Sequence, residues 1–157
     1  FFFQAEDGIR DVAVTGVRRV LFRSILAMAD GMIEKAREAM KTQSLHQILN
    51  AVWAVVAEAN RYFAGEAPWA LAKTDPAKQG TVLYVTAEVL RQVAILAQPF
   101  MPASAAKLLD ILGVPENERG FDRLGDNGKR IKQGSQLPPP TPVFPRYIEP
   151  DAAAAKG

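Results

Sequence analysis

The sequence predicts an all-α protein, a helix bundle over residues 25–113 followed by an extended, proline-rich strap and tail over residues 114–157. Three observations support this class. Apolar residues recur every three or four positions in several segments between residues 25 and 112, as expected for amphipathic helices. Proline and glycine stand where such helices start and stop. Six prolines between residues 138 and 150 exclude a helix at the end and favour a polyproline-like conformation.

The first 24 residues, "FFFQAEDGIRDVAVTGVRRVLFRS", do not fit the bundle. They have no sustained period of 2 or 3.6 residues, and they lack the order of regions expected of a secretory signal. The segment closely resembles translated sequencing-adapter DNA. We therefore expect residues 1–24 to be an irregular, artefactual segment, the alternative being a genuine irregular N-terminal arm.

The first predicted helix runs from Ile25 to about Lys41. Its apolar face repeats at spacings of three and four and comprises Leu26, Ala29, Ile33, Ala36 and Met40. Gly31 is expected to weaken this helix slightly without ending it.

A capping box predicts the start of the second helix, because Ser44 is followed three residues later by Gln47. A wide apolar stripe continues to about Tyr62 and contains Leu45, Ile48, Leu49, Val52, Val55, Val56 and Ala59. Trp53 lies one step off this stripe and is expected to be a buried edge residue. His46, in the first turn, is expected to be solvated.

The third long helix is predicted from Pro76 to about Gln98, with Asp75 as its N-cap. Its expected core residues are Val82, Leu83, Val89, Leu90, Val93, Ala94 and Leu96. Pro99 disfavours helical geometry at the preceding residue and should end or kink the helix. A shorter helix, Pro102–Leu112, should be closed by Gly113.

The proline-rich strap carries apolar side chains that should pack against another surface, namely Val143, Phe144, Tyr147 and Ile148. Two arrangements satisfy this expectation. The strap folds back along its own bundle, or the run "PPPTP" docks onto an aromatic groove of another protein.

Composition excludes several classes of function. There is no cysteine and a single histidine, so a thiolate or multi-histidine metal site is not available. Lys and Arg number 19 against 17 Asp and Glu, which is not the strongly basic footprint of a general nucleic-acid binder. No run of 18 or more apolar residues indicates a membrane span. The paired carboxylates Glu116 and Glu118 lie in a polar loop without a pocket-forming pattern, and we predict no catalytic residues.

Four stretches in order carry a family resemblance: "ANRYFAGEAPWALAK", "TVLYVTAEVLRQVAILAQPFMP", "LG" at 112–113 and "VFPRYIE" at 143–149. Together they resemble methionyl-tRNA synthetases over residues 25–150. The resemblance implies the α-helical anticodon-binding domain of these class I enzymes. It also implies a parent enzyme that attaches methionine to tRNA with ATP and Mg²⁺.

The same resemblance implies that Trp69, the tryptophan of the Ala-Pro-Trp motif, helps to read the CAU anticodon. An exposed indole held by Pro68 offers a flat platform for an unstacked base. Because stacking tolerates any base, polar neighbours are needed, and the candidates are Asn60, Arg61 and Lys73. The alternatives are that Trp69 is a buried plug between helices, that Asn60 caps its helix, and that Arg61 and Lys73 are solvated surface charges.

The motifs of the synthetase ATP site, His-Ile-Gly-His-like and Lys-Met-Ser-Lys-Ser-like, do not occur in the sequence. The Asn-x-x-x-Arg element of the family would lie upstream of Ile25. We therefore expect a non-catalytic, cytoplasmic fragment that needs no cofactor or metal of its own. Its expected partners are tRNA and the catalytic domain of the parent chain, with no membrane contact. The alternative is a stand-alone helical protein-interaction module with a proline-rich tail.

Overall fold

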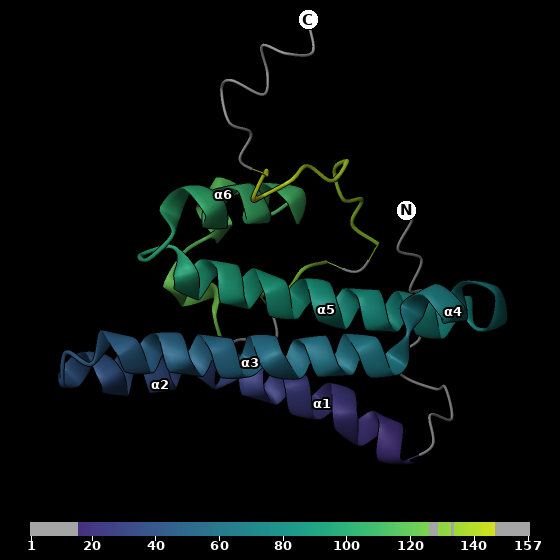
Figure 1. Ribbon diagram of the computed structural model, residues 1–157, viewed down its shortest axis with the longest axis horizontal. Helices are drawn as coiled ribbons and strands as arrows, with labels where there is room; N and C mark the ends of the chain where they lie inside the picture. Colours follow the sequence, from purple (N-terminus) through teal and green to yellow (C-terminus); the bar gives the residue numbers. More distant parts are fainter. Residues whose placement is uncertain (1–15, 126–128, 133, 147–157) are drawn as a thin grey trace, which may run out of the picture.

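The computed structural model describes residues 16–125, 129–132 and 134–146, and it is built from helices (Figure 1). In chain order these are α1 (Gly16–Asp30), α2 (Met32–Lys41), α3 (Leu45–Glu66), α4 (Pro68–Thr74), α5 (Pro76–Ala97), α6 (Pro102–Ile111) and the 3-10 turns η1 (Glu116–Glu118) and η2 (Phe121–Arg123). The long helices α3 and α5 run side by side, with α1 and α2 along one side of α3, α6 beside α5, and α4 at one end. The predicted all-α class is confirmed.

The N-terminal helix begins earlier than predicted and ends sooner. Helix α1 starts at Gly16, so residues 16–24, expected to be irregular, are helical, whereas residues 1–15 lie outside the described part of the chain. The expected single helix is divided at Gly31, where the amide still donates to Ala27 O at 3.0 Å but the next bond, from Lys35 N to Gly31 O, is stretched to 3.4 Å. Glycine's low helix propensity explains the break.

Helix α3 corresponds to the second predicted helix, but the predicted capping box at its start is wrong. The Ser44 hydroxyl lies 3.0 Å from the hydroxyl of Thr42 and makes no cap bond among the described residues. The core face consists of Ile48, Val52, Val55 and Ala59. Three expected core or edge residues are instead exposed: Met40 by 53%, Leu45 by 52% and Trp53 by 57%. No described segment covers most of their surface, so periodicity alone overestimated the buried area. His46 is exposed, as predicted.

Helix α5 is the central element, because it contacts α1, α3, α4 and α6. Its N-cap is as predicted, with Asp75 Oδ1 accepting from Lys78 N at 3.0 Å, and it ends at Ala97, just before Pro99. Within the described part of the chain, α5 is the one helix long and apolar enough to span a membrane, but 67% of its apolar window is buried inside the bundle. That burial is typical of a central bundle helix.

Helix α6 ends in a Schellman motif. Gly113 has a φ of +66°, its amide donates to Asp110 O at 2.9 Å, and Val114 N donates to Leu109 O at 3.0 Å. Both bonds satisfy carbonyls that the helix leaves free. The predicted closure at Gly113 is confirmed, with the helix one residue shorter than expected. The core continues past residue 113, because Val114 and Leu124 are buried in it.

A buried polar network joins α1, α5 and the segment after α6. Glu88, Arg91 and Gln92 are 0%, 3% and 1% exposed on α5. Arg91 forms two hydrogen bonds with the carboxylate of Glu88, at 2.9 and 2.7 Å. Glu88 Oε2 also accepts from Ile131 N at 3.0 Å, and Gln92 Nε2 donates to Asp30 Oδ1 at 2.9 Å. The network therefore fixes the segment around residue 131 against the bundle.

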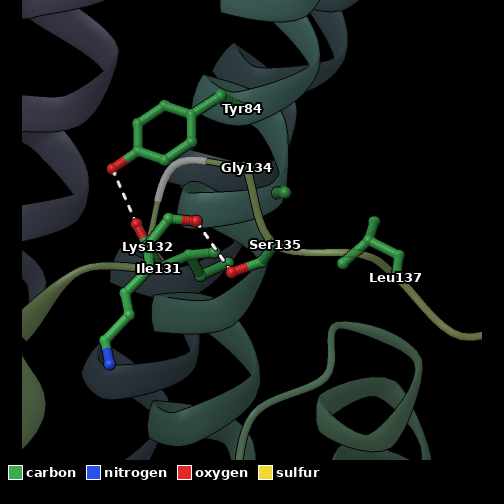
Figure 2. Close-up of a pocket in the computed structure, with 7 residues that line it drawn as sticks. Tyr84, Ile131, Lys132, Gly134, Ser135 and Leu137 are labelled. Carbon is green, nitrogen blue, oxygen red and sulfur yellow. Dashed lines mark hydrogen bonds between the residues drawn. The ribbon is translucent and has the colours of Figure 1, made fainter. Parts of the chain in front are cut away.

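Figure 2 shows how the same segment meets the side of α5. Tyr84 Oη donates to Ile131 O at 3.1 Å, and Ser135 Oγ donates to Lys132 O at 2.8 Å. The hollow between these groups encloses only about 10 Å³, far less than a small-molecule site requires. These contacts hold the strap and do not form a ligand pocket.

Beyond residue 138 the strap lies more open. Residues 138–142, the "PPPTP" run, are exposed, Val143 is half-buried, and Phe144 is 72% exposed. Phe144 therefore does not pack against the described part of its own bundle, and the expectation that it packs against another protein stays a prediction. Tyr147 and Ile148 lie outside the described residues.

Candidate nucleic-acid interface

The "EAPWALAK" sequence lies at one end of the bundle, where the chain turns sharply between α3 and α4 and again between α4 and α5. Helix α3 ends at Glu66, and Ala67 alone connects it to α4. Ala67 adopts left-handed dihedral angles, φ 43° and ψ 63°, which cost a residue with a Cβ about 1–2 kcal/mol. Pro68 then begins α4, a position that suits proline because its fixed φ is helical. The stretch between the second and third predicted helices, for which no helix was predicted, thus contains a short helix between two sharp turns.

Trp69 projects from the first turn of α4 and is 65% exposed. The alternative that it is a buried plug between helices is wrong. Its ring still has an aromatic neighbour, because the centroid of Phe63 on α3 lies 5.9 Å away with the two planes tilted by 59°. Pro68, directly before it, is buried. The indole therefore contacts Phe63 on one side, while most of its surface is open to solvent.

Two polar contacts from α5 span this corner, one to α4 and one to α3. Gln79 Nε2 on α5 donates to Pro68 O at 3.1 Å. Lys78 Nζ on α5 lies 2.5 Å from Glu66 Oε2 at the end of α3, as an ion pair rather than an aligned hydrogen bond. The two side chains are 22% and 12% exposed. These contacts span the corner on which Trp69 is mounted.

Asn60 lies within α3, six residues before its end, so the alternative that it caps the helix is wrong. It is exposed and lies on the wall of a groove of about 250 Å³ between α3 and α5. Phe63 lines the same groove and also contacts Trp69. Asn60 and Trp69 are therefore linked through Phe63. The other lining residues are Val56, Ala59, Thr86, Val89, Leu90 and Val93.

The two cationic candidates lie differently. Arg61 Nη1 pairs with Glu58 Oε2 at 2.5 Å, and its side chain is 75% exposed. It stands two residues before Phe63, which places it about 200° around an ideal helix, away from the Phe63 face. Lys73 is exposed in the last turn of α4, one helical turn after Trp69. The structure brings Lys73 onto the Trp69 helix and directs Arg61 elsewhere.

Burial and charge change one ionisable group at this end. The phenol of Tyr62 is partly buried one helical turn before Glu66. Burial first, and the negative charge of Glu66 second, raise the pKa of Tyr62 well above its ordinary value. Tyr62 is therefore a neutral phenol at any physiological pH.

The described side chains offer a binding surface. Within residues 16–125, 129–132 and 134–146, no three His, Cys, Asp or Glu side chains lie together in a way that could hold a metal ion. The features present are an exposed indole, a polar amide on a groove wall, and a cation one turn from the indole. Such a set suits stacking and edge recognition of an unpaired base.

Comparison with known proteins agrees with this arrangement. The family described as the anticodon binding domain of methionyl tRNA ligase matches residues 20–155. The chain belongs to this family. The match begins five residues before Ile25, so residues 20–24, expected to be artefactual, fall within the family's span.

The relatives are longer enzymes. The chain is 61% identical over 130 residues to a methionine–tRNA ligase of Brucella suis, covering 82% of this chain and 25% of that protein. It is 44% identical over 137 residues to one of Mycobacterium tuberculosis, covering 85% and 26%. The chain thus spans about a quarter of the curated relatives it matches.

Solved structures show the same fold. The free form of Mycobacterium tuberculosis methionyl-tRNA synthetase matches with a TM-score of 0.76 at 44% identity, covering 83% of this chain and 26% of that one. The same enzyme in complex with methionyl-adenylate matches with a TM-score of 0.76 at 45% identity, covering 80% and 25%. The helix bundle is therefore of the anticodon-binding type found in methionyl-tRNA synthetases.

Sequence reasoning missed four residues of this anticodon-binding domain that surround the Trp69 corner. Phe63 could have been found, because it lies one helical turn after Asn60 on the same face of α3. Glu66, Lys78 and Gln79 could not have been, since their contacts cross the corner between two helices. Spacing along one helix carries no information about such contacts.

Proposed function

We propose that this chain is the tRNA-recognition part of a methionine–tRNA ligase and that it binds the CAU anticodon loop. The observation that carries the proposal is the open Trp69 indole in a chain of this family. Pro68 mounts the indole, and Asn60 and Lys73 are the polar groups assigned to base edges and backbone. Arg61, which pairs with Glu58 and faces away from Phe63, is left with a contact to more distant phosphate. The catalytic domain, with its use of ATP and Mg²⁺, belongs to the remainder of the cytoplasmic parent enzyme, and the chain acts as its anticodon-binding domain.

Energetics support a role for the indole. Stacking on an aromatic side chain stabilises a bound base by roughly 1–3 kcal/mol. Net charge gives little help, because 19 basic residues face 17 acidic ones. Binding that depends on stacking and shape should therefore respond strongly to Trp69 and weakly to salt.

The test is binding of an RNA hairpin with a CAU loop to Trp69→Ala, compared with Trp53→Ala. Both tryptophans are more than half exposed, but Trp53 lies on α3 away from the corner. The Trp69 variant should lose affinity by about 5- to 150-fold, the equivalent of roughly 1–3 kcal/mol. The Trp53 variant should bind like the parent. Equal binding by Trp69→Ala and the parent would refute the assignment of Trp69.

One observation favours the alternative of a protein-interaction module, namely that residues 138–142 are exposed. Deletion of residues 138–157 tests it. If the melting temperature falls, the strap stabilises the bundle, in agreement with the position of Pro138, whose Cδ lies 3.7 Å from where a Cβ on Gly113 would be. An unchanged melt combined with binding to an aromatic-groove domain supports the alternative.

A further inference from the structure

The orientation of Trp69 depends on contacts outside its own helix. Helix α4 has seven residues, and a helix this short is unstable in isolation. It is joined to α3 through Ala67, whose left-handed conformation is unfavourable without support. Something must therefore hold α4 against the rest of the bundle.

Two successive residues of α5 make polar contacts on the two sides of the corner between α3 and α4. Lys78 pairs with Glu66 on the α3 side of the corner, and Gln79 donates to the carbonyl of Pro68 on the α4 side. Because both residues belong to the first turn of α5, they tie three helices together at one place. We call these four residues, Glu66, Pro68, Lys78 and Gln79, the corner clamp.

The ion pair in the corner clamp differs from the surface pairs of this protein. Its side chains are 22% and 12% exposed, whereas those of the Glu34–Arg37 pair on α2 are 66% and 60% exposed. An exposed pair contributes little to stability. A mostly buried pair is sensitive to loss of either partner, because the remaining charge is left without compensation.

We propose that the corner clamp positions Trp69 for RNA, with Glu66 and Lys78 as positioning residues that do not touch the RNA. The proposal rests on the proposed function, since Trp69 is taken to be the stacking platform. The opposing possibility is that Lys78 is a cation that contacts phosphate. Its engagement with Glu66, buried against the corner, argues against that role.

Fluorescence of Trp69 tests the positioning without RNA. In a Trp53→Phe background, Trp69 is the sole tryptophan of the chain. Glu66→Gln and Lys78→Gln should each lower its steady-state anisotropy and alter its quenching by iodide, while far-UV circular dichroism stays helical. Glu34→Gln, which breaks an exposed pair far from the corner, is the matched control and should change neither.

Binding of the CAU hairpin then separates positioning from direct contact. If the clamp positions Trp69, Glu66→Gln and Lys78→Gln both weaken binding, by about three- to tenfold, a part of the stacking contribution. If Lys78 contacts phosphate, Lys78→Gln weakens binding but Glu66→Gln strengthens it, because the lysine is released. The exchanged double variant, Glu66→Lys with Lys78→Glu, should restore anisotropy and affinity toward the parent values under the proposal.

The outcomes also separate this proposal from the proposed function. Unchanged Trp69 anisotropy in both single variants would overturn the proposed clamp, regardless of the affinities measured for the CAU hairpin. Altered anisotropy together with RNA binding that is insensitive to Trp69→Ala upholds the clamp as a structural device but removes its role in RNA binding. Should Glu66→Gln prove unfolded, Gln79→Glu, which puts an acceptor opposite the Pro68 carbonyl, provides the second variant and is expected to give the same loss of anisotropy.

Discussion

The ring of Phe63 and the indole of Trp69 lie 5.9 Å apart, centroid to centroid, with their planes tilted by 59°. Such tilted aromatic pairs contribute about 0.5–1.5 kcal/mol beyond the area they bury. Phe63 also lines the groove between α3 and α5 that contains Asn60. It is thus the side chain through which the stacking platform and its polar neighbour are related.

We predict that Phe63→Leu weakens binding of the CAU hairpin by several-fold and lowers stability by about 1 kcal/mol. Leucine fills much of the groove but offers no ring edge to Trp69. Titration of the hairpin and urea denaturation measure the two effects, and Phe63→Tyr, which retains the ring, should preserve most of the affinity. Full affinity in the leucine variant would show that Trp69 does not depend on this pair.

The buried pair of Glu88 and Arg91 leads to a prediction about stability. Arg91→Met leaves the Glu88 carboxylate buried without its cation, at a cost of about 3–5 kcal/mol. Arg37→Met removes a partner of similar type from the exposed pair with Glu34 and should cost about 0–1 kcal/mol. Urea denaturation of the two variants measures the contrast. Similar losses in both would mean that burial does not control these ion pairs.

Much of the fold followed from local signals in the sequence. Asp75 and Pro76 marked the start of α5, Pro99 its end, and Gly113 the closure of α6, because caps and breakers act through adjacent backbone groups. The capping box at Ser44 failed for a local reason too, since its hydroxyl lies against Thr42 instead.

What the sequence could not provide depended on distant contacts. Trp53 has the same spacing as a core-edge residue, yet no neighbouring helix among the described residues covers it. Glu88 and Arg91 were not among the predicted core residues of this helix, yet both are buried, and segments 32 to 43 residues further along the chain supply their partners, Arg123 O and Ile131 N. The candidate site shows the same division: Trp69 was predicted from a motif, whereas the contacts of Glu66, Lys78 and Gln79 required the structure.

Two glycines should respond in opposite ways to alanine. Gly65 lies in the last turn of α3, and apart from its chain neighbours and the adjacent backbone of its own helix no described atom is within 4 Å of a Cβ built there, so Gly65→Ala should stabilise by about 0.5–1 kcal/mol. Gly113 has a φ of +66°, and its Cβ would meet only ordinary contacts at 3.7 and 3.8 Å. Gly113→Ala should therefore cost about 1–2 kcal/mol through backbone conformation alone. Thermal melts show whether each variant is more or less stable than the parent. Stabilisation by Gly113→Ala would contradict the left-handed closure of α6.

Alkaline pH should weaken the fold through Tyr62. In the folded chain, burial and Glu66 raise the pKa of this phenol above its ordinary value of about 10. Above about pH 10 the unfolded chain releases the phenol proton while the folded chain keeps it, so the folded state binds more protons and its stability falls as pH rises. The slope per group is at most about 1.4 kcal/mol per pH unit, and less here because the ring is only partly buried.

Urea denaturation between about pH 9 and pH 11 compares the parent with Tyr62→Phe. The variant, which has no phenol to ionise at this position, should lose stability less steeply as pH rises. Tyr84→Phe is the informative comparison, because burial and Glu88 also raise the pKa of Tyr84, but this variant additionally loses the hydrogen bond to Ile131 O. The free energy of unfolding of Tyr84→Phe should therefore be lower than that of the parent at every pH, and it should fall less steeply above pH 10. A Tyr62→Phe curve parallel to that of the parent would show that Tyr62 ionises equally in the folded and unfolded chains.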